Sequence, residues 1–298
     1  SGVKKRFGIE GNLIILVTAL LWSTGGVLIK FIPWGSLSIA SLRGLIGVAV
    51  LLGFRLLRRR RGKAGPVRFT RFNVAAGAAM FSTSVLYLTA NKLTTAANAI
   101  VLQYIAPILI LLYTAIVQKR RPTRAEILLT VLVFVGCVLA FSDKLSTNGL
   151  LGDCIAILSG FCFAALILLS RNEKTQAEDG QIIGCGMCFL FCLPFLLTDH
   201  TIAFAPQNVG AMLALGILQY SLPSILFAKG VKMTHPVAAS IILTVEPIMS
   251  PIWVFLFLGE LPGTMAIVGF VLVISAVTLQ SLIPLLHRHK PGNVEPIG

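Results

Sequence analysis

Glu246 and Pro247 lie together in the middle of an apolar stretch long enough to cross a bilayer. A proline lacks an amide hydrogen and displaces the preceding turn, so Pro247 should free the carbonyl of Leu243 and bend the helix. An ionised carboxylate is costly at that depth, which makes it a candidate for function. We expect Glu246 to act either as a proton site or as the counter-ion of a cationic substrate. The alternative is a structural carboxylate bonded to Arg43 or to a neighbouring hydroxyl.

A second proline, Pro107, occupies a similar apolar stretch and should free the carbonyl of Gln103. Gln103 and Tyr104 are the strongly polar groups in the middle of that stretch, and Asn98 precedes them by about a turn and a half. An amide and a phenol beside a freed carbonyl suit a polar, uncharged part of a ligand. Hydrogen bonding between helices is the alternative. Pro107 and Pro247 are therefore predicted helix breaks, with the three polar residues as candidate substrate contacts.

One arginine and four aromatic residues complete the candidate set. Arg43 would snorkel if it lies near the outer end of its helix, and deeper it would need Glu246 or a substrate carboxylate as partner. Aromatic belts belong at membrane interfaces, whereas aromatic residues inside spans line cavities or pack between helices. Four residues have the second kind of position: Trp22, Tyr87, Tyr220 and Trp253.

The composition indicates an integral membrane protein. Of 298 residues, 56% are hydrophobic and 12% are charged, against about a quarter charged in soluble domains. The charges also fall in short clusters between apolar runs of roughly 18–25 residues, which is the length of a transmembrane helix. We predict an all-α protein with ten spans, at about 12–33, 37–57, 72–90, 95–117, 124–142, 149–170, 180–198, 207–228, 236–258 and 263–286.

The distribution of basic residues predicts the orientation. With the N-terminus inside, 21 of the 25 Lys and Arg residues lie on the inner side, as the positive-inside rule requires. The net charge of +14 is therefore topological, and no nucleic-acid partner is expected. Both termini should be cytoplasmic. The runs Arg58–Arg61 and Lys119–Arg121 are topology determinants and candidate contacts for anionic lipid head groups.

Several kinds of site are not expected. The six cysteines lie in or beside apolar segments, so Cys185-Gly-Met-Cys188 is better explained by packing than by a metal or redox site. No phosphate-binding loop with Lys-Ser/Thr and no His-Glu-x-x-His motif occurs. We predict no cofactor, no metal and no enzymatic activity. The basic residues before the first span resemble a signal peptide, but its apolar stretch is too long and lacks a cleavage site, so we expect it to be retained.

The two halves of the chain are related by an internal repeat. A shift of 140 residues superimposes three landmarks: Lys92 on Lys232, Pro107 on Pro247, and Pro122 on Pro262. Because each half has an odd number of spans, five, the second half must enter the membrane from the opposite side, which makes an inverted-topology repeat. We predict a cytoplasmic tail at 1–11, repeats at 12–142 and 149–286, and a second cytoplasmic tail at 287–298.

Together these features resemble the drug/metabolite transporter superfamily, specifically its EamA-type members. The resemblance covers nearly the whole chain and depends on a set of individually loose motifs: Ala19-Leu-Leu-Trp22-Ser23, Arg43, Ala97-Asn98-Ala99 with Pro107, Pro236-Val-Ala-Ala-Ser240, Glu246-Pro247, Phe257-Leu-Gly259-Glu260 and Gly269. The chain departs from the pattern where the second-half partner of Trp22-Ser23 is Cys162-Phe163 and that of Arg43 is Ile183.

The resemblance implies a secondary carrier of the inner membrane, with a central cavity between the halves and an alternating-access mechanism. It favours efflux of amino acids or amine-like metabolites, with protons as the driving ion. The close alternative is an uncoupled exchanger or facilitator of a polar metabolite such as a nucleobase or nucleoside. A lipid-modifying membrane enzyme and a channel are remote alternatives. Besides the substrate, the expected partners are protons and membrane lipids.

The oligomeric state stays open between a monomer and a weak homodimer. Small residues in the fifth and tenth spans allow close helix contact, either within one chain or between two chains. These residues are Gly136, Ala140, Gly269 and Ala276.

Overall fold

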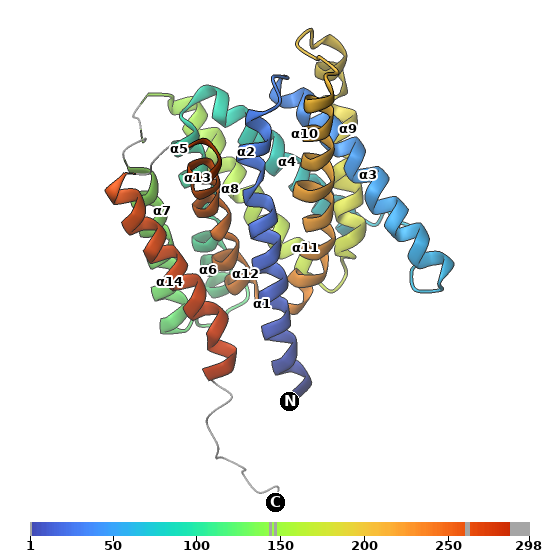
Figure 1. Cartoon of the computed structure of the whole chain (residues 1–298). Coiled ribbons are helices and arrows are strands. Elements are labelled where there is room, and N and C mark those ends of the chain that lie inside the picture. Colours follow the sequence, from blue (N-terminus) through green and yellow to red (C-terminus); the bar gives the residue numbers. More distant parts are fainter. Residues whose placement is uncertain (1, 143–144, 146–147, 260–262, 287–298) are drawn as a thin grey trace, which may run out of the picture.

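The chain folds into a bundle of helices (Figure 1). The computed structural model describes residues 2–142, 145, 148–259 and 263–286, and every regular element in these ranges is helical. The tail at 287–298, Lys144, Glu260 and Pro262 lie outside the described residues.

Each predicted span corresponds to one helix or to consecutive helices. The first half comprises α1 (Gly2–Ser23) with α2 (Gly25–Lys30), α3 (Ser36–Arg60), α4 (Arg71–Leu93), α5 (Ala96–Gln103) with α6 (Ala106–Ile116), and α7 (Arg124–Phe141). The second half comprises α8 (Leu150–Arg171), α9 (Ala177–Thr198), α10 (Pro206–Ala214) with the π-helix η2 (Leu215–Ser221) and α11 (Leu222–Met233), α12 (Pro236–Leu243) with α13 (Val245–Leu258), and α14 (Thr264–Leu286).

Nine of these helical segments, within the described residues, are long and apolar enough to span a membrane. The first segment differs, because α1 begins at Gly2 rather than near residue 12, and its apolar part, Ile9–Ser23, is shorter. The prediction of an all-α membrane protein is confirmed.

The helices pack as the repeat requires. The second and seventh spans, α3 and α9, lie against each other, and so do the fifth and tenth, α7 and α14. The third span contacts the sixth (α4 and α8), and the eighth contacts the first (α11 and α1), which is the same pair with the halves exchanged. Helix α1 begins on the side of the bundle where α3 and α14 end (Figure 1); we call this the N-terminal side.

Glycines allow the closest of these contacts. A Cβ atom at Gly44 of α3 would lie 2.7 Å from the carbonyl oxygen of Cys185 in α9. At Gly269 of α14, a Cβ atom would collide with the carbonyl oxygen of Gly136 in α7. The fifth and tenth spans therefore meet within one chain, which resolves the alternative that their small residues had left open.

The main hydrophobic core draws buried side chains from both halves. It includes Tyr104 and Ala106 from the fourth span and Leu243, Val245 and Ile248 from the ninth. The two predicted helix breaks thus face the common centre of the bundle rather than lipid. This placement agrees with the rule that irregular backbone at membrane depth is enclosed by protein or lines a cavity.

Candidate functional site

The fourth and ninth spans are both broken, and at matching places. Helix α5 ends at Gln103 and α12 ends at Leu243, which are equivalent positions under the shift of 140 residues. After each break the next helix starts close to a proline: Pro107 follows the start of α6 at Ala106, and Pro247 follows the start of α13 at Val245. The breaks occur where the sequence predicted them, because each proline removes the amide hydrogen that would continue the helix.

Tyr104 and Glu246 connect the two breaks. The Tyr104 hydroxyl donates to Glu246 Oε2 at 2.7 Å and lies 3.4 Å from the carbonyl oxygen of Leu243. That carbonyl is the one that Pro247 was expected to free. The Tyr104 ring is buried and makes an edge contact with Phe163, with 5.7 Å between the ring centroids. The phenol of one half is therefore fixed against the carboxylate of the other half.

Arg43 lies near this acid without pairing with it directly. Its charge is close enough to act on Glu246 electrostatically, but none of the ion pairs within 4 Å among the described residues joins the two. The guanidinium instead lies 4.3 Å from the centroid of the Tyr220 ring, as in a cation–π contact. Its buried Nε atom has no hydrogen-bond partner in the described chain. Arg43 thus keeps hydrogen-bonding capacity in the interior of the bundle.

The π-helix η2 positions Tyr220. Such wide turns occur frequently at functional sites, and Pro223, just after η2, cannot supply the amide hydrogen of a regular α-helix. The Tyr220 hydroxyl donates to Cys188 Sγ at 3.6 Å, so one of the clustered cysteines is a hydrogen-bond acceptor. Within the described residues, no group of three His, Cys, Asp or Glu could hold a metal ion.

A further break, in the first span, carries Trp22. Helix α1 ends at Ser23, where the indole Nε1 of Trp253 donates to Ser23 Oγ at 2.8 Å. Gln219 of η2 donates through Nε2 to the carbonyl oxygen of Trp22 at 3.1 Å, and the Trp22 ring lies 5.5 Å from that of Phe227. These contacts connect the first, eighth and ninth spans. Ser23 and Gln219 were not predicted; the small residues after Trp22 were the signal for this break.

Gln103 is held by a chain of buried hydroxyls. Its Nε2 donates to Ser159 Oγ at 3.0 Å, and Ser159 in turn donates to the carbonyl oxygen of Thr83 at 3.1 Å. The carbonyl oxygen of Gln103 is covered by α8, because a Cβ at Gly160 would lie 2.8 Å from it. Packing between helices, the alternative named for Gln103, accounts for this arrangement.

Asn98 is hydrogen-bonded to a carboxylate other than Glu246. Asn98 Nδ2 donates to Asp153 Oδ1 at 3.0 Å, and Thr94 Oγ1 donates to the same oxygen at 2.7 Å. This cluster lies at the start of α5 and α8, before the break. Tyr87 is half-buried against a small core of alanines that includes Ala99. The structure therefore brings Tyr104, Glu246 and Arg43 together, and it bonds Asn98 to a different carboxylate.

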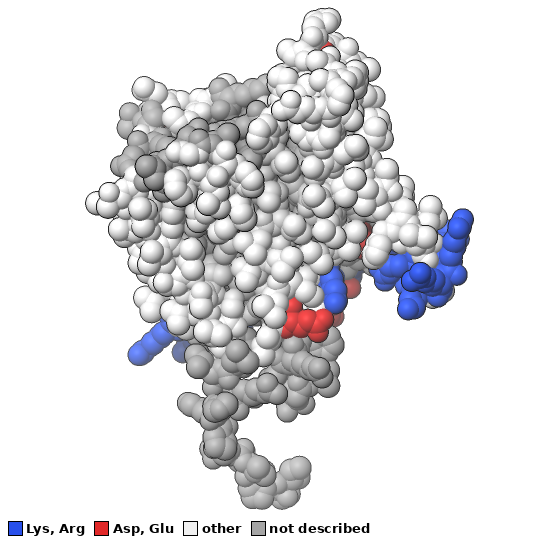
Figure 2. Space-filling model, in the orientation of Figure 1, with Lys and Arg blue, Asp and Glu red and all other residues white. Residues whose placement is uncertain are grey.

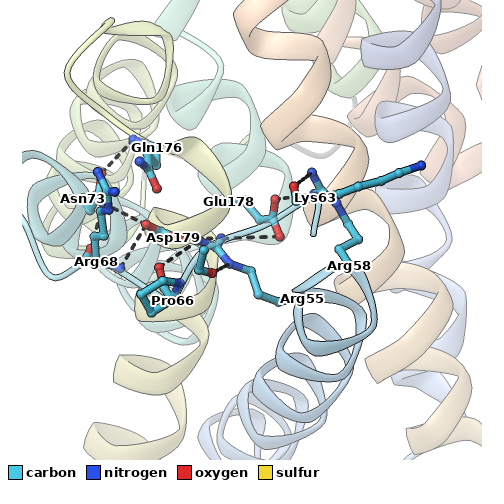
Figure 3. Close-up of polar contacts among 10 residues, drawn as sticks. Arg55, Arg58, Lys63, Pro66, Arg68, Asn73, Gln176, Glu178 and Asp179 are labelled. Atoms are coloured by element: carbon cyan, nitrogen blue, oxygen red, sulfur yellow. Dashed lines mark hydrogen bonds and ion pairs between the residues drawn. The ribbon is translucent and has the colours of Figure 1, made fainter. Parts of the chain in front are cut away.

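A buried carboxylate in α9, Asp179, was not predicted. Asp179, at the start of α9, has no exposed surface, and its Oδ1 lies 2.6 Å from Arg55 Nη1 of α3. Figure 3 shows Asn73 of α4 and the backbone of Arg68 donating to the other carboxylate oxygen. Arg55 had been counted only among the basic residues of the inner side, and a carboxylate just inside the first turn of a span was the available signal for its partner.

The opposite end of the α3–α9 pair is closed by Asp199. Its Oδ2 accepts from the backbone N–H of Gly35 at 2.9 Å, and Oδ1 accepts from Thr201. Hydrogen bonds from Ser38 and Thr201 hold the pKa of the Asp199 carboxyl below its usual range. The pair of helices is thus held by polar contacts at both ends.

His235 precedes α12 on the N-terminal side. Its Nδ1 lies 3.7 Å from Glu126 Oε1, and Glu126 is itself paired with Arg120 at 2.7 Å. Partial burial, followed by the positive charge of Arg120, lowers the pKa of His235 below 6.5, although Glu126 opposes the shift. This contact joins the start of α7 in the first half to the start of α12 in the second.

Comparison with known proteins identifies the repeats. The model of the EamA-like transporter family matches residues 9–142 and again residues 150–282. The chain belongs to the EamA-like transporter family. It is 28% identical over 283 residues to the uncharacterized transporter YwfM of Bacillus subtilis (strain 168), with 92% of this chain and 94% of that protein covered.

A second relative and a solved structure are also similar to this chain over most of its length. The chain is 25% identical over 293 residues to the uncharacterized inner membrane transporter YicL of Salmonella typhimurium, covering 92% of this chain and 95% of that protein. A solved crystal structure superimposes with a TM-score of 0.77 at 19% identity, covering 92% and 98% of the two chains, which supports the fold alone. The protein is thus a multi-pass membrane transporter, as the sequence predicted.

Proposed function

We propose that this EamA-like transporter is a secondary carrier of a small organic solute with an amino group, an amino acid or amine-like metabolite. The observation that carries the proposal is the 2.7 Å hydrogen bond from Tyr104 to Glu246. This bond joins the carboxylate that follows the break in the ninth span to a side chain of the other half. A solute or proton bound there would interact with both moving parts at once.

The surrounding groups can satisfy Glu246 in either protonation state. When ionised, Glu246 accepts from the Tyr104 hydroxyl, as in the structure. When protonated, the carboxyl would donate to the phenol oxygen, and the phenol hydrogen would turn to the Leu243 carbonyl, now 3.4 Å away. A buried polar group costs little when a partner is available. Both states therefore suit a residue that binds and releases a proton.

Competition between a proton and the solute for the Glu246 carboxylate would couple their transport. A solute ammonium needs ionised Glu246, and protonation removes that partner, so the two ligands exclude each other. This exclusion is the requirement of a proton-driven exchanger, and efflux driven by inward protons is the direction we propose. If the carboxylate instead stays ionised throughout the cycle, Glu246 is only a ligand of the solute, and the carrier exchanges solutes without protons.

Arg43 supports an acidic group on the same solute. Its guanidinium is close enough to Glu246 for their charges to interact, yet its Nε has no hydrogen-bond partner in the described residues. A carboxylate is the natural bidentate partner of a guanidinium. A solute with both groups would then lie between Glu246 and Arg43. We count Trp22, Trp253 and Tyr220 as candidate contacts for its apolar part.

Alternating access would use the two breaks as hinges. Rocking of one half against the other would close one face before the second opens, with Pro107 and Pro247 at the bends. We propose the inner membrane as location, with both termini cytoplasmic, following the distribution of basic residues. Because the fifth and tenth spans already pack within one chain, the carrier needs no second copy for this contact, and we propose a monomer or weak homodimer.

Purified protein in proteoliposomes tests the proposal, using a panel of amines, amino acids and nucleosides. Wild type should show saturable counterflow, and accumulation should require a pH gradient. Glu246→Gln should abolish gradient-driven accumulation and keep counterflow if the residue is the proton site. Loss of both would assign it to the solute. Asp153→Asn, which alters a carboxylate away from the breaks, is the matched control.

Three outcomes would contradict the proposal. Unchanged transport by Glu246→Gln in both assays would remove the acid from the mechanism. A continuous leak without saturation would indicate a channel, and chemically altered lipid would indicate a membrane enzyme.

A further inference from the structure

A basic and partly apolar arm projects from the N-terminal side of the bundle. It consists of the last turns of α3 from Phe54 onward and the segment that follows to residue 70 (Figure 1). Leu56 and Leu57 are 55% and 60% exposed, and Phe69 is 75% exposed. Figure 2 shows Lys and Arg side chains gathered at the end of this arm. Apolar and basic side chains thus share one projecting element.

Arg55 holds the base of the arm against the second half. Its Nη1 pairs with buried Asp179 at 2.6 Å, its Nε donates to the carbonyl of Gly65 at 3.0 Å, and its Nη2 donates to that of Pro66 at 3.1 Å (Figure 3). These contacts engage its donors and balance its charge with Asp179. Arg55 is therefore structural, and the segment is folded back to a defined position.

A cavity of about 320 Å³ opens between the folded segment and the start of α9. Besides Arg55, its charged lining consists of Arg58, Lys63 and Glu178. Arg58 pairs with Glu178 at 2.8 Å but keeps 39% of its side chain exposed, and Lys63 is exposed. Glu178 also lies 3.5 Å from Arg55 Nη1, so Arg55, Arg58 and Lys63 together are set against two carboxylates, Glu178 and Asp179. The cavity therefore has an excess of one positive charge.

We propose that this cavity binds the phosphate diester of an anionic phospholipid. A phosphate diester carries one negative charge, which matches the excess in the cavity, and Arg58 and Lys63 supply donors of the kind that phosphates prefer. In the proposed orientation the arm lies at the cytoplasmic leaflet, where anionic lipids attract basic segments. The exposed Leu56 and Leu57 of the same arm would lie beside acyl chains, which favours a lipid over a soluble phosphate.

The occupied cavity would also act on the junction of the halves. A phosphate at Arg58 competes with Glu178, which belongs to α9, while the arm itself belongs to α3. Bound lipid would thus replace one ionic contact between the two repeats. This proposal concerns a different region from the carrier site, so it stands or falls independently of the transported solute.

Native mass spectrometry of the purified full chain in detergent tests the site, with phosphatidylglycerol and phosphatidylcholine as probes. Wild type should retain phosphatidylglycerol in preference to phosphatidylcholine. The double variant Arg58→Gln, Lys63→Gln should lose at least tenfold in phosphatidylglycerol affinity, because the loss of one charge-assisted hydrogen bond to the phosphate already costs about tenfold. If that variant cannot be purified, Lys63→Gln alone, at an exposed side chain, should lose about tenfold, the effect of one charge-assisted hydrogen bond.

The matched control removes the same charge from the same arm outside the cavity. Arg59→Gln with Arg60→Gln should leave phosphatidylglycerol affinity within twofold of wild type, since both side chains are exposed and neither lines the cavity. Equal losses in the two double variants would overturn the site in favour of diffuse surface charge. Equal retention of the two lipids, an unchanged Lys63→Gln, or displacement of the lipid by millimolar inorganic phosphate would overturn it as well.

Discussion

The two broken helices share a backbone and differ in chemistry. Helices α5 and α12 end at equivalent positions, and each break is followed by a proline. The first break presents Tyr104 and Ala106, whereas the second presents Thr244 and Glu246 at the matching places. Because Tyr104 reaches Glu246 across the centre at 2.7 Å, the repeat has divided a hydrogen-bonded pair between its halves. The bend belongs to the fold, and the acid belongs to one half of it.

The carbonyl groups freed at the two breaks also have different surroundings. That of Gln103 is covered by the backbone of Gly160, so the first break is closed by packing. That of Leu243 lies 3.4 Å from the Tyr104 hydroxyl, which can also bind elsewhere. The first break is therefore the more rigid of the two, and the second has a contact that can be exchanged during a transport cycle.

The largest effect should come from separating the phenol and the acid. Tyr104→Phe removes a hydrogen bond to a carboxylate, which contributes about 1.5–3 kcal/mol, so the half-saturation concentration of counterflow should rise about 10- to 100-fold. In a Glu246→Gln background that retains counterflow, the same substitution should have a much smaller effect, because the partner has already changed. Additive losses would mean that Tyr104 acts independently of Glu246.

Gly160→Ala tests the closure of the first break. The added methyl group would lie 2.8 Å from the Gln103 carbonyl oxygen, and overpacking of this kind costs about 1–3 kcal/mol. The thermal unfolding midpoint in detergent should fall accordingly. Gly53→Ala, where a Cβ meets open space, is the matched control and should be neutral or slightly stabilising. An unaltered midpoint in Gly160→Ala would show that packing does not hold this break.

Substitution of the two prolines should also have different effects on turnover, with the larger effect at the second break. Pro247→Ala offers the Leu243 carbonyl an amide partner within the helix and should slow turnover roughly fivefold, the effect of about 1 kcal/mol of net hydrogen bonding. Pro107→Ala should slow it less, since the Gln103 carbonyl remains covered by Gly160. Turnover and half-saturation are measured together in counterflow, and the latter should change little. Equal slowing by both substitutions would remove the distinction between the breaks.

The smallest effect concerns the starts of the two broken helices. The Thr95 hydroxyl caps α5 by accepting from the backbone N–H of Asn98 at 3.1 Å. His235, at the equivalent position before α12 under the shift of 140 residues, makes no side-chain cap. The pKa of His235 is lowered below 6.5, so the folded protein binds this proton less readily than the unfolded chain. Stability due to this residue is thus present above pH 6.5 and is lost as the pH falls.

His235→Thr should therefore add a cap and reduce the loss of stability on acidification. Thermal unfolding midpoints of wild type and variant, measured in detergent at about pH 7.5 and pH 5.5, check this around the ordinary histidine pKa. A wild-type midpoint that rises at the lower pH would contradict the sign of the pKa shift.

Much of the fold follows from local chemistry. Apolar runs of bilayer length predict the spans, and the missing amide hydrogen of Pro107 and Pro247 predicts where two of them break, so the observed helix ends at Gln103 and Leu243 agree with expectation. The repeat follows from one constant shift. Asp179 was missed because its partner Arg55 lies far away in sequence and had already been explained by topology.

The sequence by itself determined that the chain crosses a membrane, that its halves are inverted repeats, and that Glu246 lies beside a helix break. These properties depend on hydrophobic length, on proline geometry and on the parity of five spans. Only the tertiary structure decided which groups meet. Tyr104 faces Glu246, Arg43 faces the Tyr220 ring, and Asn98 faces Asp153. Such pairings depend on the rotation and depth of helices packed at glycine contacts, and no local pattern encodes these.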